Sequence, residues 1–140
     1  MGIRIAKERL GRAKCQVRRL TRRNRGRSIT EIRDELNPFI RGWLNYFALA
    51  DAKAHMQRLD EWARRRLRQV LWKQWKTPAN RYRNLRERGV SEYWAIRAGG
   101  TSKGCWRLSA SPPLHQALDV TYWQDLGLES FLQRYKLRHT

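Results

Sequence analysis

Spacings of three and four residues separate the apolar side chains of the first twenty positions, Ile3, Ala6, Leu10, Ala13, Val17 and Leu20. That spacing places all of them on one stripe of a helix. Lys and Arg occupy many of the positions between them. The pattern therefore predicts a long, basic amphipathic helix from residue 3 to residue 20, with its apolar stripe packed inside one domain.

Two further helix starts are predicted after a Gly-containing break at residues 24–27. Ser28 and Glu31 form a Ser-x-x-Glu capping box, which starts a short helix that runs through Leu36. Asn37 can cap a second helix, and Pro38 fits its first position because that position needs no backbone N–H. We expect this second helix to cover residues 39–51.

The clearest helical pattern runs from about residue 52 to residue 76. At 100° per residue, roughly a third of the helix circumference holds the apolar positions Met56, Leu59, Ala63, Leu67, Val70 and Leu71. Arg and Lys cover the other side, and Trp72 falls between Arg65 and Arg68 on the same wheel. The pattern predicts a core helix with a basic outer face.

Shorter helices are expected in the rest of the chain, because Pro, Ser and Gly mark their starts and ends. They cover residues 77–89, 91–98, 111–126 and 129–136, with a glycine-containing loop at residues 99–104. No segment alternates as a strand would. The predicted fold class is all-α, with a helical bundle at residues 1–76 and a small helical C-terminal subdomain at residues 77–140.

Charge indicates the kind of partner. The 140 residues include 31 Lys and Arg against 12 Asp and Glu, a formal net charge of +19. Residues 1–30 hold 11 basic and one acidic side chain, and residues 61–90 hold ten and two, whereas residues 31–60 hold four and five. A compact protein with this charge repels itself unless a polyanion neutralises it. Arginine, which outnumbers lysine here, binds phosphate with a planar fork of donors, so nucleic acid is the expected partner.

A membrane is not expected as a partner. The longest apolar stretch, at residues 42–50, is far shorter than a membrane-spanning helix, and no signal peptide is recognisable at the start of the sequence. We therefore expect a soluble, cytoplasmic protein.

Two basic groups are candidates for contact with nucleic acid. The first leaves the end of the N-terminal helix and consists of Arg18, Arg19, Arg22, Arg23, Arg25 and Arg27. The second lies on the long helix and consists of Arg64, Arg65, Arg68, Trp72, Lys73 and Lys76. Arginines can neutralise phosphates, and an exposed tryptophan can stack on an unpaired base. The alternatives are a solvated charged face for the arginines and core packing for the tryptophans, above all for Trp62 and Trp75.

The sequence lacks the patterns of common catalytic and metal centres. None of its five aspartates stands beside another, whereas a polymerase holds two metal ions with paired carboxylates. Cys15 and Cys105 have no paired spacing, and the three histidines are scattered. We expect no metal, no cofactor and no catalytic activity from the chain on its own.

Two adjoining stretches carry a family signature: LTRRNRGRS at residues 20–28 and LNPFIRGWLNYF at residues 36–47. They resemble the maturase-specific domain of group II introns, and the Gly-Trp-x-Asn-Tyr-Phe element at residues 42–47 is highly specific. LDEW at residues 59–62 and WKQWK at residues 72–76 continue the resemblance. GCWRLS at residues 104–109 and LGL at residues 126–128 are similar to the C-terminal end of bacterial intron-encoded proteins.

The full protein of that family is a reverse transcriptase with fingers, palm, a helical thumb that also acts as maturase, and a DNA-binding region. The resemblance implies a thumb, or maturase-specific, domain at residues 1–76 and a DNA-binding tail at residues 77–140. It also implies binding to group II intron RNA that assists splicing and retrohoming of this mobile element. Target DNA or an RNA–DNA duplex is a further candidate partner of the tail.

Individual residues take roles from the same resemblance. Arg22, Arg23, Arg25 and Arg27 are expected to contact RNA. The thumb is expected to be organised by the motif residues Gly42, Trp43, Asn45, Tyr46 and Phe47. Gly42 would allow another backbone to approach closely, and the aromatic rings would fill the space.

Fingers, palm and endonuclease do not appear in the sequence, so the chain is expected to be a fragment, a remnant or half of a split protein. The missing reverse-transcriptase portion is then a candidate partner, and polymerisation would need a second chain with the palm. A detached thumb would expose the apolar stripe of residues 3–20, where we expect association or partial disorder. The rival hypothesis is an independent architectural binder of nucleic acid.

Overall fold

The computed structural model describes residues 2–22, 25–43 and 52–138 of the chain. Within these ranges it is built of α-helices and has no strand, which confirms the all-α prediction. The helices are α1 (Gly2–Leu20), α2 (Ile29–Trp43), α3 (Lys53–Trp75), α4 (Pro78–Glu87), α5 (Glu92–Gly99), α6 (Cys105–Leu108), α7 (Pro112–Ala117), α8 (Val120–Leu126) and α9 (Phe131–Arg138).

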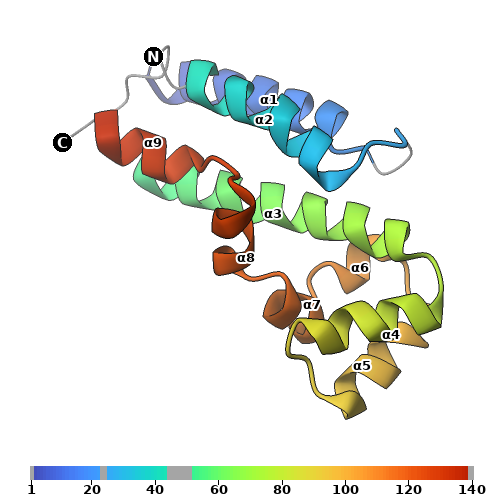
Figure 1. Cartoon of the computed structure of the whole chain (residues 1–140). Helices are drawn as coiled ribbons and strands as arrows, with labels where there is room; N and C mark the ends of the chain where they lie inside the picture. The colour runs from blue at the N-terminus through green and yellow to red at the C-terminus, as the bar shows by residue number, and fades with distance from the viewer. Residues whose placement is uncertain (1, 23–24, 44–51, 139–140) are drawn as a thin grey trace.

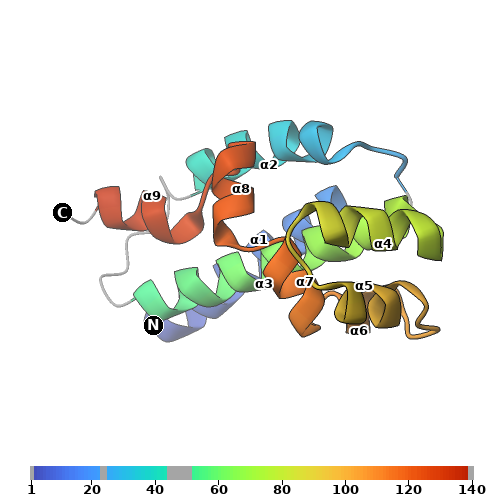
Figure 2. The same ribbon diagram turned by 60° about the horizontal axis from the view of Figure 1, so that its bottom comes forward.

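The longest helix, α3, runs through the middle of the molecule. Figures 1 and 2 show α1 and α2 side by side along one flank of α3, with α9 beside its first half and α4 to α7 around its C-terminal end. These neighbours surround α3, which explains why its buried residues are not confined to one stripe. The predicted positions Met56, Leu59 and Leu67 are buried, and so are Trp72 and Trp75 on other sides of the helix.

The second half of the apolar stripe of α1 is covered by the rest of the chain, whereas the side chains of Ile3 and Ala6 lie outside the described ones. Ala13 and Val17 are fully buried and Leu20 is 5% exposed, because α1 packs on both α2 and α3. For these positions the prediction of an exposed, associating stripe is wrong. Their burial confirms instead the packing inside one domain that their spacing predicts, with α2 and α3 as the apolar partners.

A single helix replaces the two predicted between Ser28 and Trp43. The capping box forms as expected: the Ser28 backbone N–H donates to Glu31 Oε1 at 3.3 Å, and the Glu31 N–H donates to Ser28 Oγ at 3.2 Å. The predicted second start is wrong, because α2 continues through Asn37 and Pro38. The Asn37 side chain instead binds the turn before α9, where its Nδ2 donates to the Gly127 carbonyl at 2.8 Å.

The C-terminal helices follow the expected caps with two exceptions. Thr77 caps α4 and Ser91 caps α5, each through its side-chain oxygen. The helix predicted over residues 111–126 is two helices, α7 and α8, because Asp119 accepts a hydrogen bond from the Tyr122 N–H at 2.9 Å and starts a new one. The short helix α6 follows the predicted loop at residues 99–104, in a stretch where no helix was predicted.

One side chain of α3 fixes the start of α9. The Asp60 carboxylate accepts from the Phe131 N–H at 2.7 Å, from the Leu132 N–H at 3.0 Å and from the Ser130 hydroxyl. Ser130 in turn caps the Gln133 N–H. The first N–H groups of α9, which have no partner inside the helix, are therefore satisfied from α3.

Candidate nucleic-acid interface

A group of cations surrounds one half-buried tryptophan where α1 crosses α3. The centre of the Trp62 ring lies 5.8 Å from Lys14 Nζ, 5.5 Å from Arg18 Cζ and 5.8 Å from Arg66 Cζ. Lys14 and Arg18 are one turn apart on α1, and Trp62 and Arg66 are one turn apart on α3, so the two helices present them to each other. The ring face attracts the cations and holds them together.

Arg66 joins this group to the end of α1. Its Nε donates to Thr21 Oγ1 at 3.1 Å and its Nη2 donates to the Arg18 carbonyl at 3.2 Å. Burial lowers the pKa of Arg66, and the nearby charges of Arg18 and Arg22 lower it further. We call Lys14, Arg18, Arg22, Trp62 and Arg66 the basic ridge.

The cations of the basic ridge have no acidic counterpart nearby. None of Lys14, Arg18, Arg22 and Arg66 forms an ion pair with an Asp or Glu among the residues that the structure describes. Lys14, Arg18 and Arg22 are exposed to solvent. Positive charges that lie close together at a surface attract anions, because an anion relieves their repulsion. The phosphates of nucleic acid are the usual anionic partner of such a cluster.

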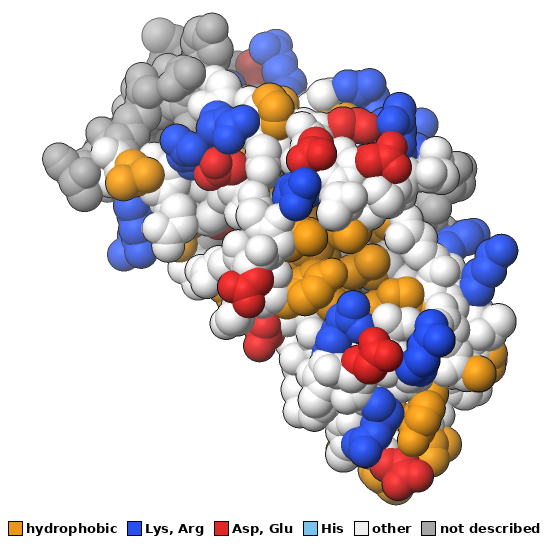
Figure 3. Space-filling model, in the orientation of Figure 1, with side chains coloured by type: hydrophobic (Ala, Val, Ile, Leu, Met, Phe, Trp, Pro, Cys, Tyr) orange, Lys and Arg blue, Asp and Glu red, His pale blue; other side chains and the backbone are white. Residues whose placement is uncertain are grey.

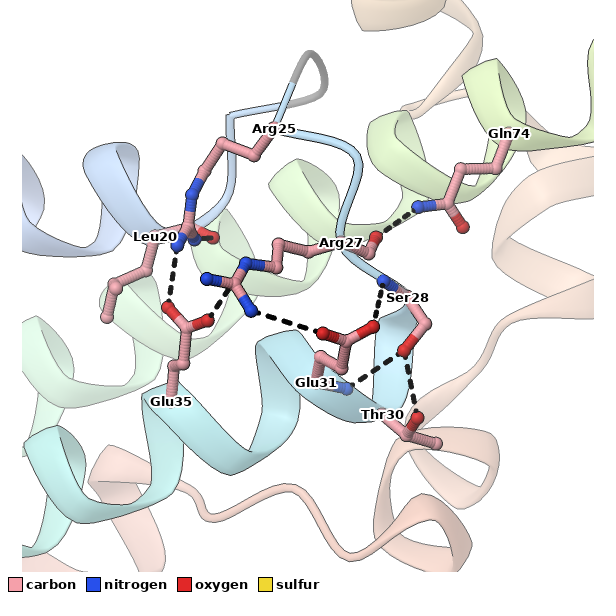
Figure 4. A network of polar contacts seen from close by, with 8 residues as sticks. All are labelled: Leu20, Arg25, Arg27, Ser28, Thr30, Glu31, Glu35 and Gln74. Atoms are coloured by element: carbon pink, nitrogen blue, oxygen red, sulfur yellow. Dashed lines mark hydrogen bonds and ion pairs between the residues drawn. The ribbon is translucent and has the colours of Figure 1, made fainter.

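The predicted arginines beyond α1 have a different environment. Arg25 is half-buried, where its Nη1 donates to the Leu20 carbonyl at 2.7 Å and its Nη2 donates to Glu35 at 2.8 Å (Figure 4). Arg27 pairs with Glu31 at 3.2 Å and with Glu35 at 3.6 Å. These contacts hold the turn between α1 and α2, so both guanidinium groups already have anionic partners.

The same is true of other cations along α2. Arg33 pairs with Asp34 at 2.9 Å, and Arg41 pairs with Glu129 at 3.2 Å. On the face in Figure 3, red acidic side chains lie among the blue basic ones, and hydrophobic side chains gather in the middle. Unlike these paired cations, the four cations of the basic ridge have no ion-pair partner in the described part of the chain.

The remaining predicted residues of the first group divide as follows. Arg19 is exposed and its Nε donates to Gln16 Oε1 at 3.1 Å. Arg23 lies outside the described residues. RNA contact by any member of this group stays a prediction, but Arg18, Arg19 and Arg22 are accessible for it.

The second predicted group does not form one surface. Trp72 is fully buried, so its placement on a basic outer face is wrong and neither ring face can stack on a base. Arg68 is 4% exposed, because α6 and the residues after it cover this side of α3. Lys73 and Lys76 are exposed.

Arg64 and Arg65 lie near α6. The Arg65 guanidinium stacks on Trp106 at 3.8 Å from the ring centre, and its Nη2 donates to the Trp106 carbonyl at 3.0 Å. Its Nε donates to Ser109 Oγ at 3.1 Å. Arg64 is partly exposed and forms no hydrogen bond or ion pair that involves another described residue.

Of the five motif residues, the structure describes Gly42 and Trp43. Trp43 packs edge-on against Phe131 of α9, with ring centres 5.5 Å apart. A Cβ added to Gly42 would meet nothing within 4 Å in the described part of the chain, so the close backbone approach predicted there is not observed among those residues. Asn45, Tyr46 and Phe47 lie outside the described residues.

Sequence reasoning missed Lys14 and Arg66, and for Trp62 it left packing and a role in binding as alternatives. A signal existed, because Lys14 lies one turn before Arg18 and Trp62 one turn before Arg66. The crossing of α1 over α3 brings these two pairs together, and helical periodicity within one segment does not predict that crossing.

No helix in the described ranges combines the length and apolar character needed to cross a bilayer. Nor do the His, Cys, Asp and Glu side chains of these ranges gather in threes as metal ligands would.

Comparison with known proteins adds one finding. The family model described as group II intron, maturase-specific domain, matches residues 10–89. The matched range covers more than half of the chain and contains all five residues of the basic ridge. It confirms the resemblance seen in the motifs at residues 20–47. A comparison with curated proteins gives no match.

Proposed function

Because the chain belongs to the group II intron maturase-specific domain family, we propose that it binds folded group II intron RNA and thereby assists splicing and mobility of the intron. The basic ridge carries this proposal, since Lys14, Arg18 and Arg66 meet around Trp62 with the charge of Arg22 close to Arg66. None of these four cations forms an ion pair with a carboxylate of the described residues. Burial is the main cause of the lowered pKa of Arg66, and a phosphate bound there would offset the added repulsion from Arg18 and Arg22.

Contact through phosphates fits the task of a maturase. Phosphate contacts position a protein on nucleic acid without reading its sequence, and folded RNA is recognised mainly by shape. A rigid pair of helices that presents fixed cations would favour the compact RNA fold in which phosphates match them. In this proposal Arg19, Lys73 and Lys76 add further contacts, whereas Arg25 and Arg27 mainly hold the turn beside the ridge.

Residues 77–140 are assigned to target DNA in the same proposal. The support is an exposed aromatic group on α5, where Tyr93 is 58% and Trp94 51% exposed. Arg97 lies over both rings, at 5.1 Å from the centre of Tyr93 and 6.0 Å from that of Trp94. Aromatic rings with a nearby cation suit unpaired bases. Trp94→Ala should then weaken binding to a single-stranded DNA oligonucleotide more than binding to intron RNA; equal losses would contradict the assignment.

The proposal gives the chain no catalytic step. Mobility also requires reverse transcription, which we assign to fingers and palm outside this sequence. If the chain contributes a thumb to that reaction, adding it to a reverse-transcriptase portion that lacks one should raise cDNA synthesis.

The central test compares two charge-matched double variants of the full chain. Arg18→Gln with Arg22→Gln removes two cations of the basic ridge, while Lys53→Gln with Lys136→Gln removes two exposed cations near the start of α3 and on α9. Binding to intron RNA is measured over a range of salt concentrations. The slope of log affinity against log salt is negative, and each lost phosphate contact should reduce its magnitude by about 0.7 to 0.9. The ridge variant should show this loss, and the control should not.

Two further readouts test the maturase role itself. The unmodified chain should prefer the folded intron over a shuffled RNA of equal length at moderate salt, and it should increase spliced product at limiting Mg²⁺. Equal affinity for both RNAs, with no effect on splicing, would instead support an architectural binder.

A further inference from the structure

A second basic site shares Trp62 with the basic ridge. A cavity of about 550 Å³ opens between α3 and the segment from α6 to α8. Its lining includes Trp62 and five basic side chains, Arg58, Arg64, Arg65, Arg68 and His115. No part of the proposed function above uses this cavity.

The two acidic residues that line the cavity do not neutralise these arginines. Asp119 accepts from the Tyr122 N–H as the cap of α8, and Glu61 accepts from Gln57 Nε2 at 3.4 Å. Neither forms an ion pair with an arginine of the lining in the described part of the chain. The cavity therefore carries a surplus of positive charge.

Two of the arginines are held in place by neutral oxygens. Arg68 is 4% exposed, and its Nε donates to the Ser109 carbonyl at 2.7 Å. Arg65 donates to Ser109 Oγ and stacks on Trp106. The two terminal amino groups of Arg68 form no hydrogen bond with any residue that the structure describes. These amino groups are not among the fully buried side-chain atoms of the described residues, so they reach solvent at the wall of the cavity, where an anion can accept from them.

The charges in the cavity oppose one another. Burial lowers the pKa of Arg68 to about 10, with Arg64 and Arg65 adding to the effect. Burial also lowers the pKa of His115, and the next causes are the charges of Arg68, Arg64 and Arg65. An anion between α3 and α7 would raise both pKa values, because it would stabilise each of these positive charges.

We propose that this cavity holds a backbone phosphate of the nucleic acid that the basic ridge binds. The inference rests on the proposed function for the identity of that nucleic acid. Phosphate is favoured because forked guanidinium donors match its oxygens. Trp62 borders both sites, so a strand that leaves the ridge reaches the cavity within a short distance.

The test uses the full chain and the His115 ring as a reporter. NMR of the histidine rings follows a titration with a short hairpin of intron RNA, and a parallel titration uses inorganic phosphate. We expect the hairpin to shift the His115 resonances and to raise the pKa of His115. Inorganic phosphate should do so only at far higher concentration. An equal response to both would mean a small-anion site and would overturn the proposal.

Arg64→Gln tests the cavity without disturbing its supports, because Arg64 forms no hydrogen bond in the described residues. It should weaken hairpin binding severalfold and reduce the magnitude of the slope of log affinity against log salt by about 0.7 to 0.9. It should also reduce the shift of the His115 resonances that the hairpin causes. The matched control is Arg12→Gln, since Arg12 is exposed and lies on another face of α1 from Lys14. Identical behaviour of the two variants would overturn the proposal.

Failure of this inference is distinguishable from failure of the proposed function. If the hairpin binds with ridge-dependent affinity but leaves His115 unchanged, the cavity proposal fails alone. If intron RNA and shuffled RNA bind with equal affinity and shift the His115 resonances equally, the maturase role fails while the phosphate site stands.

Discussion

The indole of Trp72 is fully buried, and its Nε1–H has no hydrogen-bond partner among the described residues. Arg81 of α4 covers the ring at 4.6 Å from its centre, and Trp75 packs against its edge at 6.0 Å. A helical wheel correctly makes Trp72 a neighbour of Arg65 and Arg68. It does not predict that later segments of the chain cover this side of α3, and for that reason both Trp72 and Arg68 were assigned to the wrong environment.

The burial of Trp72 leads to a prediction about stability. Trp72→Ala should lower the free energy of unfolding by about 3 to 5 kcal/mol, because it leaves a large cavity. Trp72→Phe should cost less, since it also removes the unsatisfied donor. Urea unfolding measures both, with Trp94→Phe as a control at a half-exposed position. Folded Trp72→Phe protein should bind RNA as the unmodified chain does, and weaker binding at unchanged stability would restore the surface role first predicted for this residue.

Lys76 has a strained backbone where α3 ends. Its φ of 63° and ψ of −64° place it at the centre of a γ-turn, in which the Thr77 N–H donates to the Trp75 carbonyl at 2.7 Å. This conformation is rare and costs on the order of 1 to 3 kcal/mol for a residue other than glycine. No sequence signal marks it, because glycine is the residue expected at such a position.

Replacing Lys76 with glycine should therefore leave the free energy of unfolding unchanged or raise it by up to about 2 kcal/mol. Lys73→Gly is the matched control, because it removes the same charge from ordinary helical backbone in the last turn of α3 and should cost up to about 1 kcal/mol. Thermal unfolding of both variants provides the comparison. Equal losses at the two positions would show that the turn at Lys76 is not strained.

At the scale of the helices, the prediction succeeded where the signal is local. Thr77 and Ser91 cap the helices that they precede, and Gly127 ends α8 with a φ of 87°. It failed at Asn37, whose amide side chain binds the Gly127 carbonyl and accepts from the Glu129 N–H. Asparagine serves equally well as a helix cap and as a bridge to a distant turn, and only the tertiary structure decides between them.

The contact between Asp60 and the start of α9 predicts a localised loss of stability. Asp60→Asn places an amide N–H₂ where one of the backbone N–H groups of Phe131 and Leu132 now donates, so one donor loses its acceptor. We expect a cost of about 1 to 3 kcal/mol in urea unfolding, with early loss of hydrogen-exchange protection in α9. Asp125→Asn, at an exposed position on α8, should change stability little. If hydrogen-exchange protection is lost equally throughout the chain, and not first in α9 and its neighbours, this role is contradicted.

The same carboxylate predicts a pH dependence. Burial raises the pKa of Asp60, although hydrogen bonds from Ser130, Leu132 and Phe131 oppose the shift. The folded state therefore binds this proton more tightly than the unfolded state. The associated stabilisation is present below the ordinary Asp pKa and is lost as the pH rises through the folded value. The free energy of unfolding of the unmodified chain, minus that of Asp60→Asn, should therefore fall as the pH rises through the mildly acidic range. An increase of this difference with pH would refute the assignment.

For the whole molecule, the distribution of a few acids determines which cations are free. The sequence predicts the arginine-rich surface and the scarcity of acids near the N-terminus. It does not predict that Glu31 and Glu35 neutralise Arg25 and Arg27 across the α1–α2 turn. Nor does it predict that cations of α1 and α3 meet at Trp62. The candidate site therefore depends on pairings between helices, which periodicity within one helix does not contain.

Packing across residue 76 bears on the domain boundary predicted there. Phe131 of α9 is 1% exposed and packs against Trp43 of α2, and the Tyr135 hydroxyl accepts from the Ala52 N–H at 3.3 Å. Buried residues before and after residue 76 belong to one apolar cluster. The C-terminal helices therefore cover surface of α2 and α3 that residues 1–76 alone would expose.

We accordingly expect the full chain to unfold in one transition, with coincident urea curves from far-ultraviolet circular dichroism and tryptophan fluorescence. A fragment of residues 1–76 should lack a cooperative transition, because it loses the cover that α9 and α6 provide for α3. A longer fragment of residues 1–89, which ends with the matched family range, still lacks both helices and should behave in the same way. Cooperative unfolding of residues 1–76 at the midpoint of the full chain would instead support an independent domain that ends near Thr77.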